Sequence, residues 1–296
     1  MTAVYANEEI LSQPACWAEA AQLASSTGEL LPAPGESVAV VGCGTSWFMA
    51  MAYASLRERA GHGLTDAFAA SEFPAARPYD RILAISRSGT TTEVLDLLAS
   101  AKERSQRTSA ITAVDGVPIH DVVDGAVTLG FADERSVVQT RFATSALALL
   151  RAGLGEDLAP VIADARTALA EADPLGDVEQ ITFLGRGWTI GLAHEAALKT
   201  REAAQFWAES YPAMDYRHGP IAIAQPGRAV WAFGAVPAGL DADVRRTGAR
   251  FITSDLDPMA HLIIAQRAAV GLASRRGLDV DQPRNLTRAV ELPPQR

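Results

Sequence analysis

The stretch Ile85-Ser86-Arg87-Ser88-Gly89-Thr90-Thr91-Thr92-Glu93 lies between an apolar run, residues 81–85, and a helical pattern. The run predicts a buried strand, and the pattern after it predicts an amphipathic helix. A strand–turn–helix of this kind directs backbone N–H groups and the positive end of the helix at one point. A helix N-cap needs one hydroxyl, whereas this turn carries five. We therefore interpret it as a phosphate-binding turn.

The composition indicates a globular enzyme. The chain has 296 residues, 48% of them hydrophobic and 21% charged, which is enough for one large or two ordinary domains. The net charge of −9 argues against a nucleic-acid partner. No apolar run reaches the length of a membrane span, and residues 1–20 do not resemble a signal peptide. Two cysteines, Cys16 and Cys43, fit a reducing compartment, so we expect a cytoplasmic protein.

Strands are predicted at 37–41, 81–85 and 181–184, among others, and a helix is predicted over 136–150. Predicted strands thus alternate with predicted helices, which favours parallel sheets covered on both faces. The pattern restarts near residue 173, and Val41-Gly42-Cys43-Gly44 aligns with Leu184-Gly185-Arg186-Gly187 at an offset of 143 residues. We therefore predict an α/β protein made of two similar doubly wound parallel-sheet subdomains that arose by internal duplication. The expected boundaries are 1–36 for an N-terminal helical extension, 37–172 for a phosphate-binding domain, and 173–296 for a catalytic domain with a C-terminal tail.

The two copies are not expected to be equivalent. At the same offset, the Ser86–Gly89 turn falls on residues 229–232, which contain no hydroxyl. The second half must therefore contribute something other than phosphate binding.

A predicted helix from about Trp188 to Glu209 carries Glu195, Lys199 and Glu202 at spacing i, i+4, i+7, so the three share one helical face. A solvated ion-paired face is the simple alternative. The segment is otherwise rich in Ala, Leu and Ile, however, and it is followed by His218 beside Gly219-Pro220. An imidazole on a rigid turn, with two carboxylates and a lysine nearby in sequence, forms a candidate acid/base set.

Other chemical motifs are incomplete. The glycine turns at 42–44 and 185–187 lack the third glycine of a dinucleotide fingerprint, and no Walker lysine follows a glycine-rich loop. His194-Glu195 opens like a zinc-protease helix, but Leu198 stands where the second histidine belongs. Ala84 replaces the leading glycine of a nucleophile elbow. We expect no cofactor and no catalytic metal.

Several motifs in order carry a family resemblance, over about residues 37–291. The chain resembles the isomerase half of glucosamine-6-phosphate synthase and, more widely, tandem sugar-isomerase (SIS) domain proteins, including stand-alone amino-sugar-phosphate deaminase/isomerases. The matching stretches are Cys43–Ser46, Ser86–Thr91, Leu184–Gly187, Glu195–Glu202, Ala208–Tyr211, Arg217–Pro220 and Asp279–Arg288.

The resemblance implies a homodimer that acts on a sugar 6-phosphate. Glu202 matches the base that moves a proton between C1 and C2, and His218 matches a ring-opening histidine donated by the neighbouring subunit. Lys199 and Glu195 match residues near the reactive end of the sugar. The residues implied to hold the phosphate and sugar are Cys43, Gly44, Thr45, Ser46, Ser86, Arg87, Ser88, Thr91 and Gln139.

The chain also departs from that pattern. It begins Met1-Thr2-Ala3, without the glutaminase domain of the synthase, so we expect no glutamine-dependent synthesis by this chain alone. Arg288 matches the lysine that forms a Schiff base with the ketose, and an arginine is a poor nucleophile. Arg87 replaces a glutamine of the phosphate turn and is expected to add a fork to the phosphate.

The sequence favours a phosphosugar aldose–ketose isomerase, or a deaminase that releases ammonia from an amino-sugar 6-phosphate as it isomerises. Chemically, such a reaction needs a carboxylate base, an acid and a cation, and no redox cofactor. Two alternatives stay open. One is a deglycase of fructosamine 6-phosphates, and the other is a non-catalytic sugar-phosphate sensor in a regulator. A sensor of that kind usually carries a basic DNA-binding module, and the 36 residues before the first predicted strand are not basic.

Overall fold

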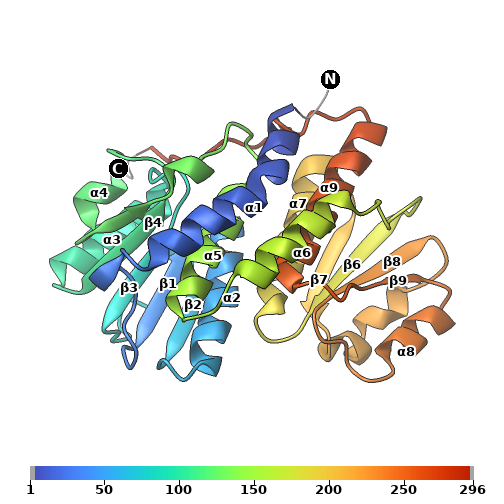
Figure 1. The fold of residues 1–296 in the computed structure, drawn as a ribbon, viewed down its shortest axis with the longest axis horizontal. Coiled ribbons are helices and arrows are strands. Elements are labelled where there is room, and N and C mark those ends of the chain that lie inside the picture. The colour runs from blue at the N-terminus through green and yellow to red at the C-terminus, as the bar shows by residue number, and fades with distance from the viewer. Residues whose placement is uncertain (1–3, 294–296) are drawn as a thin grey trace. The chain divides into compact units, whose positions relative to one another are not determined.

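A computed structural model describes residues 4–293 (Figure 1). The chain forms two compact units, and neither is a single stretch of sequence. Unit 1 combines residues 1–14, 135–140 and 159–286, and unit 2 combines residues 15–134, 141–158 and 287–296. No helix within residues 4–293 is long and apolar enough to cross a membrane.

Unit 2 is built on a five-stranded parallel sheet in the order β2–β1–β3–β4–β5. Its strands are β1 Val38–Gly42, β2 Thr65–Ala69, β3 Arg81–Ile85, β4 Arg107–Thr112 and β5 Ala126–Thr128. Every residue of β1 and β3 is buried. Strands buried along their whole length belong to parallel sheets that are covered on both faces, as the sequence predicted.

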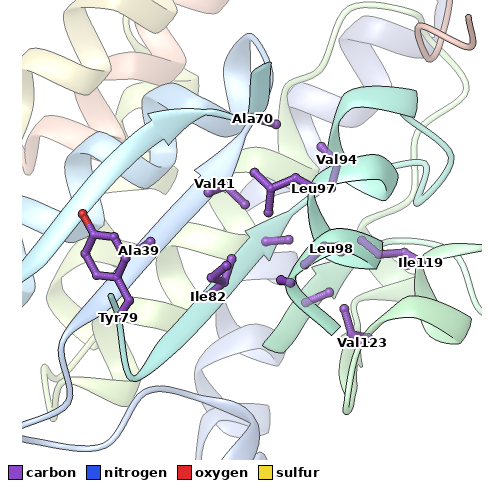
Figure 2. Packing of buried hydrophobic residues seen from close by; sticks show 13 residues of the cluster. Ala39, Val41, Ala70, Tyr79, Ile82, Val94, Leu97, Leu98, Ile119 and Val123 are labelled. Atoms are coloured by element: carbon purple, nitrogen blue, oxygen red, sulfur yellow. The ribbon is translucent and has the colours of Figure 1, made fainter. Parts of the chain in front are cut away.

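One face of this sheet is covered by α3 (Thr92–Glu103) and α4 (Ile119–Val122), and Figure 2 shows the apolar cluster between them and the strands. Alternate strand residues, such as Ala39 and Val41, meet Leu97 and Leu98 of α3 there. Helix α2 (Thr45–Arg59) packs against β1 and against α5 (Arg141–Gly153). The short 3-10 turns of unit 2 are η1 Gly28–Leu30, η2 Ala70–Glu72 and η3 Gly130–Ala132.

Unit 1 contains a four-stranded parallel sheet in the order β7–β6–β8–β9. Its strands are β6 Gln180–Gly185, β7 Ala208–Pro212, β8 Arg228–Phe233 and β9 Arg250–Ile252. Its other elements are α6 Ala159–Ala170, α7 Thr189–Ala204, η4 Asp215–His218, η5 Pro220–Ile223, α8 Leu240–Arg246 and α9 Pro258–Arg275. Helices α6 and α7 pack against α9, while α8 contributes to an apolar cluster with β6 and β8.

The strand orders confirm two similar doubly wound α/β subdomains, because β1 to β4 correspond to β6 to β9; in the described part of the chain the second copy has no counterpart of β5. The offset of 143 residues holds as far as Phe68 and Tyr211, the partners of Val41 and Leu184. It then grows to 148, because the same two residues pair with Ala84 and Ala232 on their other side. The five extra residues lie between β7 and β8, in the stretch that contains His218.

This change of register corrects one alignment from the sequence. Residues 229–232 lie within β8, so they do not match the Ser86–Gly89 turn. The true counterpart follows Phe233 and is Gly234-Ala235-Val236-Pro237, which also lacks a hydroxyl. The second copy therefore still lacks a hydroxyl-bearing turn at this place, although the stretch concerned differs from the one that the sequence alignment gave.

Helix α1 (Val4–Ala24) continues through Pro14. A proline has no N–H, so the carbonyl of Ile10 loses its partner four residues on. The amide of Gln13 replaces it, with Nε2 3.3 Å from Ile10 O, and the same Nε2 lies 2.8 Å from the Gln266 amide oxygen of α9. Residues 4–14 of this helix thus belong to unit 1, whereas Trp17 bonds Thr144 of α5 within unit 2.

Candidate active site

Two glycine turns at the carboxyl edge of the unit 2 sheet bring most of the predicted phosphate residues together. Strands β1 and β3 are parallel neighbours, so the turns that follow them lie side by side. Ligands of open α/β sheets bind at this edge.

The first turn, residues 42–46, depends on its glycines. A Cβ on Gly42 would lie 2.8 Å from the Ser46 backbone carbon, and Gly44 has a φ of +54°. The chain can therefore pass directly from β1 into α2, whose first residues are Thr45 and Ser46. Both side chains are buried, and the Cys43 thiol is half-buried. Burial raises the pKa of Cys43, and the nearby Glu93 carboxylate adds to this effect.

The second turn, residues 86–91, is fixed by its own hydroxyls and by β4, whose Thr112 hydroxyl donates to the Arg87 carbonyl at 3.2 Å. Ser86 Oγ accepts from Gly89 N at 3.3 Å, and Ser88 Oγ accepts from Thr90 N at 3.2 Å. Gly89 has a φ of +65°, and a Cβ there would lie 2.4 Å from Val117 Cγ2. Thr91 occupies the N-cap of α3, yet its side chain makes no capping hydrogen bond. The simple interpretation of this threonine as a helix cap is therefore not realised.

The side chain of Arg87 is directed into unit 2. Its guanidinium is almost fully buried, with Nη1 3.5 Å from Glu134 Oε2 and Nη2 2.7 Å from the Arg288 carbonyl. Glu134 also accepts the backbone N–H of Arg141 at 2.8 Å. Sequence reasoning did not find Glu134, although a buried acidic residue opposite a buried arginine is the expected partner.

Arg288 holds the C-terminal segment, residues 287–292, beside Glu134, the partner of Arg87. Its guanidinium bonds the Asp133 carboxylate and the Glu134 carbonyl. Farther along, Val290 O accepts from Thr92 N at 3.1 Å, at the start of α3. The structure thus places Arg288 in a contact that holds residues 287–292 against unit 2.

In unit 1, α7 presents Glu195, Lys199 and Glu202 on one side. Lys199 Nζ lies 3.7 Å from Glu195 Oε1, and it donates to Glu202 Oε2. The exposed fractions of the side chains are 1% for Glu195, 3% for Lys199 and 19% for Glu202. A solvated helix face is therefore excluded. A buried ion pair is weak evidence for a stabilising role, so two carboxylates around one buried ammonium mark a candidate functional site.

Helix α7 starts as α2 does. A Cβ on Gly185 would lie 2.2 Å from Thr189 O, and Gly187 has a φ of +58°, close to that of Gly44. The helix therefore owes its position to the same kind of glycine turn as its counterpart α2.

His194, which precedes Glu195 on α7, is half-buried with Nδ1 2.8 Å from Ser210 Oγ, and burial lowers its pKa.

Two further predicted residues belong to unit 1. His218 ends η4 with an exposed imidazole that makes no hydrogen bond or ion pair within residues 4–293. Gln139 lies in the segment 135–140, and its Oε1 is buried without a hydrogen-bond partner in the described part of the chain. Among residues 4–293, no cluster of three or more His, Cys, Asp or Glu side chains could hold a metal ion.

Comparisons with known proteins agree with this architecture. Residues 33–152 match the SIS domain model, which identifies an SIS domain in that part of the chain. The chain is homologous to the glutamine–fructose-6-phosphate aminotransferase (isomerizing) of Pyrobaculum aerophilum, at 30% identity over 97% of this chain and 56% of that protein. The chain spans about half the length of the curated relatives it matches.

Solved structures extend the likeness to the whole fold. Glucosamine-6-phosphate deaminase from Thermotoga maritima is 25% identical with a TM-score of 0.79, covering 97% of this chain and 99% of that one. The C-terminal domain of the Francisella tularensis glucosamine–fructose-6-phosphate aminotransferase shares the fold, at 23% identity and a TM-score of 0.82, over 94% and 98% of the two chains. The likeness in fold therefore extends over nearly the whole chain.

Proposed function

We propose that this protein is an amino-sugar-6-phosphate deaminase/isomerase, or an aldose–ketose isomerase of the same substrate class, that works without a cofactor. The observation that carries the proposal is the buried Glu195–Lys199–Glu202 set on α7, in a chain whose other half keeps two hydroxyl-bearing turns. The deaminase version is favoured by the likeness of the whole chain to the Thermotoga maritima deaminase.

The phosphate is assigned to the two turns of unit 2. Thr45, Ser46, Ser88 and Thr91 supply neutral donors, and the starts of α2 and α3 supply N–H groups and positive dipole ends. Arg87 is already engaged by Glu134 and the tail, so the hydroxyls and backbone N–H groups carry the phosphate.

The proton transfer is assigned to Glu202. In the open-chain amino sugar, its carboxylate takes the proton from C2, which leaves an enolamine, and returns it to C1. The resulting C2 imine takes up water and releases ammonia, so the products are a ketose phosphate and ammonia. Glu202 suits this role because its side chain is partly accessible and is oriented by Lys199. The Lys199 ammonium, with Glu195 behind it, stabilises oxygen charge as it develops.

His218 is proposed as the ring-opening acid, donated to the active site of a second subunit in a cytoplasmic homodimer. Its exposed imidazole on the rigid turn before Gly219-Pro220 supports this role. Arg288 is assigned to holding the tail, because its guanidinium bonds Asp133 and the Glu134 carbonyl. We therefore expect no Schiff base at this position.

The test is a panel of sugar 6-phosphates incubated with the purified protein, with ammonia and ketose phosphate followed together. The panel contains glucosamine, fructose and glucose 6-phosphates and a fructosamine 6-phosphate. Ammonia and fructose 6-phosphate in equal amounts from glucosamine 6-phosphate are the expected result. Exchange of aldose and ketose without ammonia would make the protein a plain isomerase, and release of another amine a deglycase. Binding without turnover of any member would overturn the enzymatic proposal in favour of a sensor.

A further inference from the structure

A carboxylate near the start of the chain holds a segment that is distant in sequence. Glu9 of α1 is 2% exposed, and its Oε1 accepts the backbone N–H groups of Arg135 at 2.6 Å and Ser136 at 3.1 Å. The Ser136 hydroxyl bonds its Oε2. A buried carboxylate that meets three donors is a strong and directional anchor.

The same segment is held from a second direction. Val137 N donates to the Asp281 carbonyl at 3.2 Å, while the Asp281 carboxylate accepts the N–H groups of Val4, Tyr5 and Ala6 at 2.8–3.1 Å, at the start of α1. The Arg135 guanidinium also lies 5.3 Å from the centre of the Tyr5 ring. Helix α1, residues 135–137 and Asp281 thus interlock, and all of them belong to unit 1.

The segment continues to the catalytic lysine of the proposed mechanism. Val138 and Thr140 line a cavity of about 10 Å³ together with Lys199, Ala203 of α7 and Ile10 of α1. Between them lies Gln139, whose buried Oε1 has no hydrogen-bond partner within residues 4–293. The wall beside Lys199 is therefore formed by a segment without regular secondary structure, and its position depends on Glu9.

We propose that Glu9 is a positioning residue, which fixes residues 135–140 against Lys199 and so holds Lys199 and Gln139 in place for the reaction. This inference rests on the proposed function and extends it to a helix that the sequence marked as an extension. Enzyme activity is sensitive to small displacements, because a shift of about 1 Å in a supporting group can lower turnover about a hundredfold.

A merely structural anchor would make different predictions. Loss of such an anchor would lower the free energy of unfolding and leave turnover by the remaining folded protein intact. Loss of a positioning residue lowers kcat of the folded protein. The KM should change little, because the phosphate turns of unit 2 contain none of the atoms that Glu9 holds.

The test compares Glu9→Met, which removes both acceptors at similar volume, with Glu8→Met on the exposed neighbour and with the conservative Glu9→Gln. For Glu9→Met, we expect the amides of Arg135 and Ser136 to exchange hydrogen about tenfold faster or more. We also expect kcat for glucosamine 6-phosphate to fall about tenfold or more, with KM within about threefold. Glu9→Gln should recover most of kcat, since its amide oxygen can still accept from Arg135 and Ser136, and Glu8→Met should match the wild type.

Faster exchange with unchanged kcat would overturn the positioning role, and unchanged exchange would overturn the anchor itself. If Glu9→Met does not fold, Ser136→Ala removes one of the three bonds and should lower kcat several-fold at unchanged KM; no change in kcat would overturn the proposal. A wild-type protein that turns over no sugar of the panel would refute the proposed function and, with it, the catalytic part of this inference. Hydrogen exchange would then decide on the anchor alone.

Discussion

Helices α2 and α7 occupy the same place in the two halves and have opposite chemical characters. Each follows a strand that ends in a glycine with no room for a Cβ, Gly42 or Gly185. At the offset of 143 residues, the positions of Glu195, Lys199 and Glu202 in α7 are filled in α2 by Ala52, Leu56 and Arg59. The first two are buried apolar residues and the third is exposed. The scaffold was thus retained in both copies while the ionisable set exists in one.

The turns after β3 and β8 show the reverse. The first has Ser86, Ser88 and Thr91, and the second is Gly234-Ala235-Val236-Pro237. After a duplication, each copy is free to lose what the other supplies. The comparison indicates that the glycine turns specify the fold in both halves, whereas the proposed mechanism assigns phosphate binding to one half and proton transfer to the other.

The largest expected effect concerns α7. Glu202→Gln keeps the size of the side chain and removes the base, so we expect kcat for glucosamine 6-phosphate to fall about a thousandfold, within the usual range for a general base. Steady-state kinetics and the exchange of the C2 proton with solvent both measure it. Arg59→Gln, at the matching position of α2, is the control and should leave kcat unchanged. A comparable loss of kcat in both variants, or no loss in Glu202→Gln, would contradict the assignment of proton transfer to α7 alone.

The second largest effect is a loss of stability, which should appear in both halves when alanine replaces Gly185 or Gly42. A Cβ on Gly185 would lie 2.2 Å from Thr189 O, and one on Gly42 would lie 2.8 Å from the Ser46 backbone carbon. Backbone atoms cannot give way as flexible side chains can, so Gly185→Ala should lower the free energy of unfolding by about 3 kcal/mol, and Gly42→Ala by somewhat less. Denaturant unfolding measures both. Gly130→Ala, where nothing lies within 4 Å, is the control and should change stability by less than about 0.5 kcal/mol. Wild-type stability in Gly185→Ala would refute the shared role of these glycines.

Much of this architecture could be predicted because local sequence patterns determine it. The strands predicted at 37–41, 81–85 and 181–184 correspond to β1, β3 and β6, and the Glu195–Glu202 spacing placed three groups on one helix face. The prediction of a helix over 136–150 was wrong at its start, because α5 begins at Arg141. Residues 135–137 bond Glu9 and Asp281 instead, and no local pattern reveals partners more than 120 residues away.

The ion-pair and hydrogen-bond partners of side chains could not be predicted from the sequence either. Arg87 was expected at the phosphate because it lies in the phosphate turn, but a guanidinium is long enough to turn inward, and Glu134 is buried beside it. The alignment offset of 143 residues between the two halves was also wrong after β7. The five extra residues around His218 change nothing in the strand pattern, so only the pairing of β6 with β8 reveals them.

A third, smaller effect tests the hydroxyl turn. Thr91→Val keeps the shape of the side chain and removes a hydroxyl that makes no capping bond to α3. We therefore expect an unchanged free energy of unfolding and a KM for the sugar phosphate raised about fivefold to tenfold, the value of one hydrogen bond of about 1 kcal/mol. Thr167→Val, on the exposed side of α6, should leave KM unchanged. A drop in stability with unchanged KM would return Thr91 to a structural role.

A fourth effect separates the cores of the two sheets by the pH dependence of their stability. His261 of α9 is buried beside Phe233, and its Nε2 lies 2.8 Å from Trp231 Nε1, the donor. Burial lowers the pKa of His261 to about 4. Because the unfolded chain keeps the ordinary histidine pKa of about 6.5, it binds more protons than the folded protein between these values. The contribution of this neutral imidazole to stability is thus fully present above about pH 6.5 and is lost as the pH falls towards 4, by at most about 1.4 kcal/mol per pH unit. Denaturant unfolding from pH 7 to pH 5 should show this slope in the wild type and a flatter one in His261→Gln. Hydrogen-exchange protection factors, which correct for the slower intrinsic exchange at low pH, should fall between pH 7 and pH 5 in β8 and α9 more than in β3 and α3. An equal fall in both sheets would show that the acid sensitivity does not come from His261.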